Sequence, residues 1–466
     1  MNAFDLVVIG SGPAGQKAAI QGAKAGAAVL IIECEPQVGG ACVHKGTVPS
    51  KALRETALSL SSFQRRSGSV FEVTMRDDLQ VSSLMLRLDA VISGHERYIS
   101  DQLRRNGVHI WRGKARFAEP LVVEVGAIGG TRREAHAKNV IIATGSVPRT
   151  PSGIPIDHEH VLDSDSILSM RYLPASLTVL GAGVIASEYA SIFAALGVKV
   201  VMIDQGARPL GFFDPELTSR FVRYLESCNG RFQGDSRVVR VAWDGLSEVA
   251  TELATGETVR AEKLLCALGR VANLEGLNIE AAGLTKTDRG LIAVDAHCQT
   301  AVPHVYAVGD VIGPPSLAST SMEQGRRAAR HALGLALPTA PEMIPLGIYT
   351  IPEMASVGLS EKEALAAHGS ALVGRARFEE LARGQIAAIE DGFLKLVADA
   401  AGRRVLGVQI VGEGATELVH VGQMALAAGL DVDTFVDNIF NFPTLAEAYR
   451  VAALDVVRQR PPGASS

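Results

Sequence analysis

Two glycine-rich turns, each set between a short apolar strand and a helix, constrain the fold of this 466-residue chain most strongly. The first unit is predicted as a strand at Phe4–Ile9, a turn at Gly10–Gly15, a helix at Gln16–Gly26 and a second strand at Ala28–Glu33. This order is typical of a βαβ unit, in which glycines let the backbone approach a phosphate at the helix N-terminus. We therefore expect this segment to bind a dinucleotide.

The same pattern recurs further along the chain. A strand at Leu177–Leu180 precedes a glycine turn at Gly181–Ala186, and a helix at Ser187–Leu196 leads to a strand at Lys199–Asp204. Alanine is accepted at the third glycine position of such turns. The sequence therefore predicts two nucleotide-binding folds of the α/β class in one chain.

Each turn supplies small residues for close approach, and each second strand ends in a carboxylate that can accept a ribose hydroxyl. The expected contacts are Gly10, Gly12, Gly15 and Glu33 in the first unit and Gly181, Gly183, Ala186 and Asp204 in the second. Asp204 favours the free 2′-hydroxyl of NAD(H), because a carboxylate repels a 2′-phosphate. Arg208 lies close in sequence, so NADP(H) is disfavoured but stays open.

Composition excludes several other classes of protein. Lys and Arg number 45 against 50 Asp and Glu, a net charge of −5, and without a long basic run this argues against nucleic acid as a partner. Apolar residues make up 47% of the chain, but no apolar run approaches the ~18 residues of a membrane span. The first residues also lack the basic start and cleavage site of a secretory signal.

The five cysteines are scattered and form no CxxC pair, which indicates neither a disulfide framework nor a metal site. We therefore expect a reducing compartment, the cytoplasm.

The rest of the chain is expected to supply further α and β elements. Amphipathic stretches across 61–110 predict helix, Leu121–Ala143 predicts short strands around a glycine turn, and Ser321–Leu333 predicts a helix. The run PTAPEMIP at 338–345 is typical of a linker, and the residues after it should form a separate α+β domain.

A chain of 466 residues is expected to hold about three or four domains. The predicted division is a dinucleotide-binding part at 1–150, a second dinucleotide-binding domain at 151–275, a central part at 276–340, and a C-terminal α+β domain at 341–466.

Assigning FAD to the first fold depends on a family resemblance, carried by the run GGACVHKGTVPSK at 39–51. With ATG at 143–145, ALGR at 267–270 and TAVPHVYAVGD at 300–310, this run resembles the flavin-dependent disulfide oxidoreductases, such as lipoamide dehydrogenase and glutathione reductase. The resemblance spans nearly the whole chain. It implies that 1–150 is the first part of an FAD-binding domain, that 151–275 binds NAD(P), that 276–340 is the second FAD-binding or central part, and that 341–466 is an interface or dimerisation domain.

This resemblance implies further contacts with the cofactors. The implied contacts are Gly40, Thr144, Gly145, Gly269, Gly309 and Asp310. It also implies that Lys51 and Glu188 pair beside the flavin, the lysine tuning its charge and the glutamate lining the nicotinamide pocket. A buried ion pair with only a structural role is the alternative for these two residues.

Two departures from the disulfide enzymes define the subfamily. Thr47 stands where those enzymes have their second cysteine after Cys42, and Phe442 stands where they have the histidine of the His-Pro-Thr segment. Both departures, together with GIYTIPE at 347–353 and ELARGQI at 380–386, resemble the soluble, flavin-containing pyridine nucleotide transhydrogenases.

The resemblance implies hydride transfer between NADPH and NAD through FAD, by a ping-pong reaction without a redox-active disulfide. Lys51, Glu188, Cys42 and Thr47 are the candidate catalytic residues, although Cys42 also fits a small buried apolar role. The resemblance further implies a homodimer or larger homo-oligomer, a cis peptide bond before Pro443, and an interface role for Glu447.

Three other functions stay open. An NADH-dependent diaphorase would pass electrons to a quinone, dye or metal, and a redox sensor or scaffold would bind flavin with negligible turnover. A thiol–disulfide reductase would need Cys42 to pair with a distant cysteine. That third function has little support, because Cys34, Cys228, Cys266 and Cys298 are expected in strands or after them.

Overall fold

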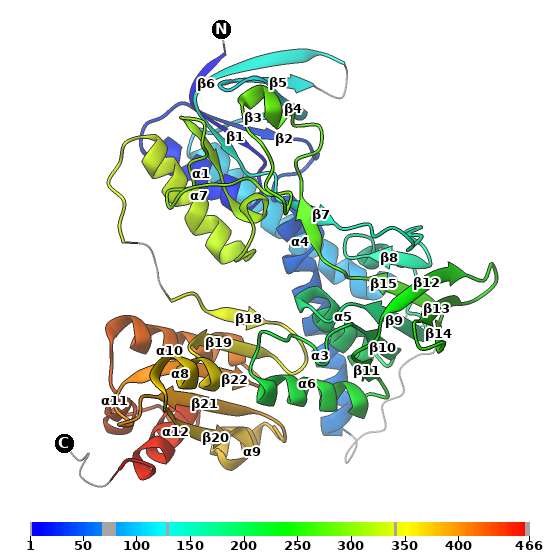
Figure 1. Cartoon of the computed structure of the whole chain (residues 1–466), viewed down its shortest axis with the longest axis vertical. Helices are drawn as coiled ribbons and strands as arrows, with labels where there is room; N and C mark the ends of the chain where they lie inside the picture. The colour runs from blue at the N-terminus through cyan, green and yellow to red at the C-terminus, as the bar shows by residue number, and fades with distance from the viewer. Residues whose placement is uncertain (1, 68–80, 127–129, 340–342, 462–466) are drawn as a thin grey trace.

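The computed structural model describes residues 2–67, 81–126, 130–339 and 343–461. The chain forms two nucleotide-binding parts, each built on a largely parallel sheet, and a C-terminal part built on an antiparallel sheet (Figure 1).

The first sheet has the order β3-β2-β1-β6-β5-β4, and β17 pairs with β6. Its strands are β1 (Ala3–Ile9), β2 (Val29–Glu33), β3 (His109–Arg112), β4 (Lys114–Glu119), β5 (Val122–Gly126), β6 (Arg132–Ile142) and β17 (Val305–Ala307). All of β2 and the last four residues of β1 are buried and, apart from Glu33, apolar, as expected for strands covered on both faces. β17 is parallel to β6, with Val305 paired to Val140 although the two are 165 positions apart, so the first fold is discontinuous in sequence.

Helices cover this sheet and lead away from it. α1 (Pro13–Lys24) packs against α7 (Ala318–Ala332), and the two lie side by side in Figure 1. The short α2 (Gly40–His44) leads into α3 (Thr47–Ser67), which runs down to the second nucleotide fold beside α4 (Val81–Arg105). Residues 68–80 of the predicted helical stretch lie outside the described residues.

The second sheet is parallel, with the order β11-β10-β9-β15-β8. Its strands are β8 (Val161–Asp163), β9 (Ser176–Leu180), β10 (Lys199–Ile203), β11 (Arg231–Gln233) and β15 (Lys263–Cys266). α5 (Val184–Ala195) and α6 (Pro215–Ser227) belong to this fold. Smaller sheets are made by β12 (Val238–Trp243), β13 (Val249–Leu253) and β14 (Thr258–Ala261), and by β7 (Ser146–Pro148) with β16 (Arg270–Ala272).

The C-terminal sheet has the order β18-β19-β22-β21-β20, with antiparallel neighbours throughout. Its strands are β18 (Leu346–Ile348), β19 (Met354–Gly358), β20 (Leu372–Arg377), β21 (Phe393–Ala398) and β22 (Val405–Val411). The helices of this part are α8 (Glu361–His368), α9 (Ala382–Ile386), α10 (Ala415–Ala428), α11 (Val432–Asp437) and α12 (Glu447–Arg458). α10 and α12 pack on the sheet through buried apolar side chains.

The fold class is confirmed, as are the strands of Leu121–Ala143 and the helix near Ser321–Leu333. One detail is wrong: both nucleotide-binding helices begin three residues earlier than predicted, at Pro13 and Val184. Gly15 and Ala186 therefore lie inside the first helical turn, because the helix must start directly after the second glycine for its free N–H groups to reach a phosphate.

The four domain ranges stay predictions, and residues 340–342 of the predicted linker lie outside the described part of the chain. Among the described residues, no helix is both long and apolar enough to cross a membrane. The same residues hold no cluster of three or more His, Cys, Asp or Glu side chains that could bind a metal.

Candidate active site

The first glycine turn is shaped by close backbone contacts. Gly10 has a φ of +103°, and a Cβ there would lie 2.4 Å from the carbonyl oxygen of Ala143. A Cβ on Gly15 would lie 2.0 Å from the carbonyl oxygen of Gly10. Gly12 faces open space, so the backbone at the N-terminus of α1 stays accessible. This is the geometry that a pyrophosphate group requires.

Glu33 lies at the end of β2 and points back to the same turn. Its Oε2 accepts hydrogen bonds from the Ser11 backbone N–H at 2.9 Å and the Ser11 hydroxyl at 2.5 Å, and its Oε1 accepts one from the Glu35 N–H at 2.9 Å. The side chain is buried. The carboxylate is thereby fixed beside the turn, where it can also accept a ribose hydroxyl.

Other predicted flavin contacts come to the same place from distant parts of the sequence. A Cβ on Gly40 would lie 2.8 Å from Gly12 Cα, and a Cβ on Gly309 would lie 3.5 Å from Ala14 Cβ. Asp310 accepts a hydrogen bond of 2.5 Å from the Ser146 hydroxyl, directly after the ATG run.

The hydroxyl oxygen of Thr144 is buried and has no hydrogen-bond partner among the described residues. An unpartnered polar atom, an open glycine and a fixed carboxylate around one helix N-terminus fit the FAD that the family resemblance implies. Gly145, with a φ of +70°, follows Thr144 directly.

The second turn repeats the first. Gly181 has a φ of +106°, and a Cβ there would lie 2.6 Å from the carbonyl oxygen of Ala267. Gly183 faces open space, and Ala186 is buried in the first turn of α5. Gly269, with a φ of +102°, lies just past the end of β15 and also faces open space. The open backbone at the α5 N-terminus can hold a second dinucleotide.

Asp204 follows β10, as expected for a ribose ligand. Its Oδ1 accepts a hydrogen bond of 2.6 Å from the Gly206 N–H. The guanidinium of Arg208 is directed elsewhere and donates to the carbonyl oxygens of Gly211 at 2.6 Å and Phe213 at 2.8 Å. The acidic residue therefore stands beside the site while the nearby arginine is bound to its own loop.

Lys51 and Glu188 meet between the two nucleotide folds. Lys51, on α3, places its Nζ 2.6 Å from Glu188 Oε2, on the second turn of α5. The Lys51 side chain is 24% exposed and that of Glu188 only 5%. The predicted pairing is therefore present, and it places a positive charge where the two folds face each other.

A third residue of this site comes from the C-terminal part and is not among the predicted site residues. The Tyr349 backbone N–H donates to Glu188 Oε1 at 3.0 Å, and the Tyr349 ring centre lies 4.8 Å from Lys51 Nζ. One turn later on α5, the Ser191 hydroxyl accepts the Ile351 N–H at 3.0 Å. Tyr349 and Ile351 lie in the run GIYTIPE, which was the only sequence signal for this contact.

Arg54 strengthens the same junction one turn after Lys51. Its Nε donates to the Thr350 carbonyl oxygen at 3.0 Å, and its Nη2 lies 3.0 Å from Glu353 Oε1. Glu353 in turn accepts a hydrogen bond of 2.9 Å from the Thr416 hydroxyl. The C-terminal part is thus fastened to α3 beside the Lys51–Glu188 pair.

Cys42 and Thr47 lie at the junction of α2 and α3. Burial raises the pKa of the Cys42 thiol above its ordinary value, although a hydrogen bond with the Thr47 hydroxyl and the charge of Lys51 act in the opposite direction. Cys42 is therefore a protonated thiol at neutral pH rather than a reactive thiolate.

All five cysteines are free in this structure. The predicted placement of the others is right for Cys34, just after β2, and for Cys266, which ends β15. It is wrong for Cys228, which caps the C-terminus of α6, and for Cys298, which lies in a turn before β17.

The C-terminal segment that carries Phe442 is exposed in the single chain. Phe442 is 69% exposed and Ile439 is 96% exposed. The Phe442–Pro443 peptide bond is cis, as the resemblance implied. Glu447 accepts a hydrogen bond of 3.3 Å from the Thr444 N–H within the same segment.

Two nucleotide folds with a glycine turn in each, and a C-terminal antiparallel domain, define a class of flavin- and nucleotide-dependent oxidoreductase. Residues 4–325 match the family model for pyridine nucleotide-disulphide oxidoreductases, and residues 344–453 match the dimerisation domain of that family. The chain belongs to this family.

Within the family, the chain is similar to proteins named soluble pyridine nucleotide transhydrogenase. It is 44% identical over 464 residues to the one from Mycobacterium bovis, with 98% of each chain covered, and 41% identical over 460 residues to the one from Yersinia pestis, with 97% of each covered. The predicted family and the predicted cofactors, FAD with NAD(H) and NADP(H), are confirmed at this level.

Solved structures support the same fold. LpdA from Mycobacterium tuberculosis superposes with a TM-score of 0.89 at 26% identity, covering 97% of this chain and 99% of its own. The HOCl-induced flavoprotein disulfide reductase RclA from Escherichia coli superposes with a TM-score of 0.87 at 25% identity, with the same coverage.

Proposed function

We propose that this chain transfers a hydride from NADPH to NAD through FAD, in a ping-pong reaction that uses no redox-active disulfide. The bound FAD supplies a two-electron carrier that takes a hydride from one nicotinamide and returns it to another at the same site. The observation that carries the proposal is Thr47 in place of a second loop cysteine, in a chain whose relatives at 41–44% identity are named transhydrogenases.

The chain's own residues have binding and orienting roles in this proposal. The glycine turns at Gly10 and Gly181 admit the two dinucleotides, and Lys51 holds a positive charge between them that Glu188 orients. Burial keeps Cys42 protonated, which supports hydride exchange over thiol exchange.

Anaerobic stopped-flow absorbance tests the two halves of the reaction. NADPH is expected to bleach the flavin of FAD-loaded enzyme, and NAD or thio-NAD is expected to restore its colour. Failure of NADPH to bleach the flavin would contradict the proposal. Bleaching followed by negligible turnover with every acceptor would support the sensor hypothesis instead.

The absence of a disulfide step has its own prediction. Cys42→Ser is expected to keep kcat/KM within about twofold of the wild type, because a protonated thiol and a hydroxyl have similar size and no electrons pass through either. Cys228→Ser, away from the site at the end of α6, is the matched control. A loss of more than tenfold confined to Cys42→Ser would favour the thiol–disulfide hypothesis.

Asp204 and Arg208 favour a second candidate, an NADH-dependent diaphorase acting on a quinone, dye or metal. The Asp204 carboxylate lies just past β10 and accepts the Gly206 N–H, while the Arg208 guanidinium is bound to Gly211 and Phe213 and is not free for a 2′-phosphate. Flavin reduction by NADH with NADPH inert, together with fast transfer to a quinone, would establish this function and overturn the first.

We further propose a cytoplasmic homodimer or larger homo-oligomer that binds neither nucleic acid nor membrane. The match of residues 344–453 to a dimerisation domain supports the assembly, and five unpaired cysteines are typical of a reducing compartment.

A further inference from the structure

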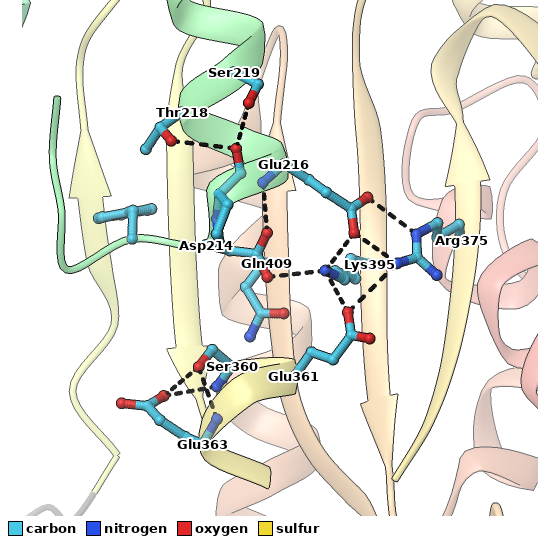
Figure 2. Close-up of polar contacts among 12 residues, drawn as sticks. Asp214, Glu216, Thr218, Ser219, Ser360, Glu361, Glu363, Arg375, Lys395 and Gln409 are labelled. Carbon is cyan, nitrogen blue, oxygen red and sulfur yellow. Dashed lines mark hydrogen bonds and ion pairs between the residues drawn. The ribbon is translucent and has the colours of Figure 1, made fainter. Parts of the chain in front are cut away.

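A buried lysine joins the second nucleotide fold to the C-terminal sheet. Lys395, on β21, has a side chain that is only 2% exposed. Its Nζ lies 2.9 Å from Asp214 Oδ2, 2.7 Å from Glu216 Oε1 and 2.7 Å from Glu361 Oε2, and Figure 2 shows the carboxylates converging on it. Burial alone would lower the pKa of Lys395, but the hydrogen bonds to these carboxylates raise it above its ordinary value. The lysine therefore stays charged.

Two arginines act at the same junction. Arg375, on β20, donates two hydrogen bonds to the Glu216 carboxylate (Figure 2). Its Nε lies 3.1 Å from Oε2, and its Nη2 lies 2.6 Å from Oε1. Glu216 lies on α6. Arg220, on the same helix, pairs with Asp391, and its guanidinium lies 5.6 Å from the ring centre of Phe393. The first half of α6 is thus fastened to the C-terminal sheet by charged contacts at several points.

The N-terminal end of α6, which contacts the C-terminal sheet, is connected through the loop before it to the second glycine turn. Asp214 is the N-cap of α6 and accepts the Glu216 N–H at 2.8 Å. The loop before it begins at Asp204, and the Leu210 N–H donates to the Ala182 carbonyl oxygen at 2.8 Å, inside the second glycine turn. Contacts therefore run from Lys395 through α6 and its loop to the backbone expected to bind a dinucleotide.

The buried ion pairs around Lys395 are better suited to fixing the position of α6 on the C-terminal sheet than to stabilising the fold. A buried ion pair often stabilises a fold no more than apolar residues of the same size would, and in some proteins its directional contacts instead select one geometry. Transfer between two rings is sensitive to geometry, since a misplacement of about 1 Å can cost on the order of a hundredfold in rate.

We propose that Lys395 is a positioning residue that fixes the second nucleotide fold on the C-terminal sheet, so that a nicotinamide bound there is held against the flavin beside Lys51 and Glu188. The C-terminal part thereby sets the distance of hydride transfer without contacting the substrate through this cluster. This inference rests on the proposed hydride transfer between nicotinamide and flavin.

The test is Lys395→Met in FAD-loaded enzyme, measured by anaerobic stopped-flow flavin reduction with whichever of NADH and NADPH reduces the wild type faster. The limiting rate is expected to fall at least tenfold, while the Kd for the nucleotide changes less than threefold and the FAD content and flavin spectrum stay unchanged. A merely structural role would lower the unfolding temperature and leave the limiting rate unchanged, and that result would overturn the inference.

A second variant guards against misfolding, because Lys395→Met leaves Asp214 buried without its cation. Lys395→Met combined with Asp214→Asn removes both charges and keeps a residue that caps helices well. The double variant is expected to show the same loss of limiting rate, and a wild-type rate in a folded double variant would overturn the inference.

The matched control is Arg231→Met. It removes an ion pair of 3.0 Å with Glu257 on the same nucleotide fold, away from the C-terminal sheet, and is expected to leave flavin reduction unchanged. The test of Lys395 measures only flavin reduction. If the wild-type flavin is reduced but passes no hydride to thio-NAD, that result contradicts the proposed function and leaves the role of Lys395 unaffected.

Discussion

Lys51 lies between a carboxylate and an aromatic face, and each comes from a different part of the chain. Glu188 of the second nucleotide fold binds its ammonium at 2.6 Å, and the ring of Tyr349 lies 4.8 Å from it. An ammonium near a ring face is attracted by about 0.5–2 kcal/mol, more when it is shielded from water. Tyr349 therefore restrains Lys51 as well as supplying an N–H to Glu188.

Tyr349→Leu is expected to reduce the rate of flavin reduction about tenfold, which corresponds to about 1.4 kcal/mol, because the ring is lost while the backbone N–H stays. Tyr349→Phe keeps the ring and is the matched control, with a rate expected within about twofold of the wild type. Stopped-flow absorbance measures both. Equal rates in the leucine and phenylalanine variants would rule out a role for the ring.

Among single residues, the sequence predicts the role of those whose role depends on their neighbours in sequence. Gly10 and Gly181 are recognisable because a strand before and a helix after each of them leave only a few backbone shapes open. Tyr349 and Lys395 are not recognisable in this way, because their partners lie 161 residues away at Glu188 and 181 residues away at Asp214. The Lys51–Glu188 pair was foreseen only through family resemblance.

Between elements, α1 and α7 approach each other closely. A Cβ on Gly325 would lie 2.0 Å from the carbonyl oxygen of Ala14, so glycine is required where the two helices meet. This contact places α7, which follows Gly309 and Asp310, against the helix whose N-terminus is expected to hold the pyrophosphate.

Gly325→Ala is expected to destabilise the protein by about 1–3 kcal/mol, because the added methyl forces α1 and α7 apart. Weaker FAD retention should accompany the loss. The control is Gly94→Ala, in α4, where nothing lies within 4 Å of the new Cβ. It is expected to raise the free energy of unfolding by about 1 kcal/mol, because alanine has a higher helix propensity than glycine. Denaturant unfolding and FAD content check both variants, and a Gly325→Ala protein as stable as the wild type would contradict the tight approach.

The N-terminal turn of α6 makes the contact with the C-terminal sheet sensitive to acid. Hydrogen bonding to Arg375 lowers the pKa of Glu216 from 4.5 to about 2. A carboxyl group with a lowered pKa in the folded state stabilises the fold above its ordinary pKa, and this stabilisation is lost as the pH falls toward the folded value.

Glu216→Gln is therefore expected to be less stable than the wild type at pH 7, with a difference that shrinks as the pH falls from about 4.5 to about 2. Urea midpoints of the two proteins across this range measure the difference. A difference that stays constant from neutral to acid pH would show that the charge of Glu216 does not stabilise this junction.

Element boundaries were predictable to within a few residues where apolar periodicity was strong, as in both βαβ units. The predicted helix starts are three residues late because the predicted turns extend to Gly15 and Ala186, whereas both residues lie in the first helical turn.

Across the whole molecule, the single chain leaves apolar side chains exposed on its C-terminal part. Ile439 is 96% exposed and Phe442 is 69% exposed. Large apolar side chains of this kind are typical of a surface that another protein covers. A second copy is the expected partner, because this part of the chain matches a dimerisation domain.

Ile439→Asp combined with Phe442→Asp is expected to weaken self-association at least tenfold, because two charges would be buried in the contact. Sedimentation velocity over a concentration series measures the shift from dimer to monomer. Leu246→Asp, at an 87% exposed position on the turn between β12 and β13, is the control and should leave assembly unchanged. An unaltered oligomer in the double variant would place the interface elsewhere.

The discontinuity of the first sheet has a consequence for biosynthesis. The second sheet has all its strands once residue 266 has been made, but the first cannot add β17 beside β6 until residue 307 follows. At roughly 5–20 residues per second, β17 emerges about ten to thirty seconds after β6. The last strand of the second sheet is therefore synthesised before the last strand of the first, so the part of the chain expected to enclose FAD is complete only after the second sheet has all its strands.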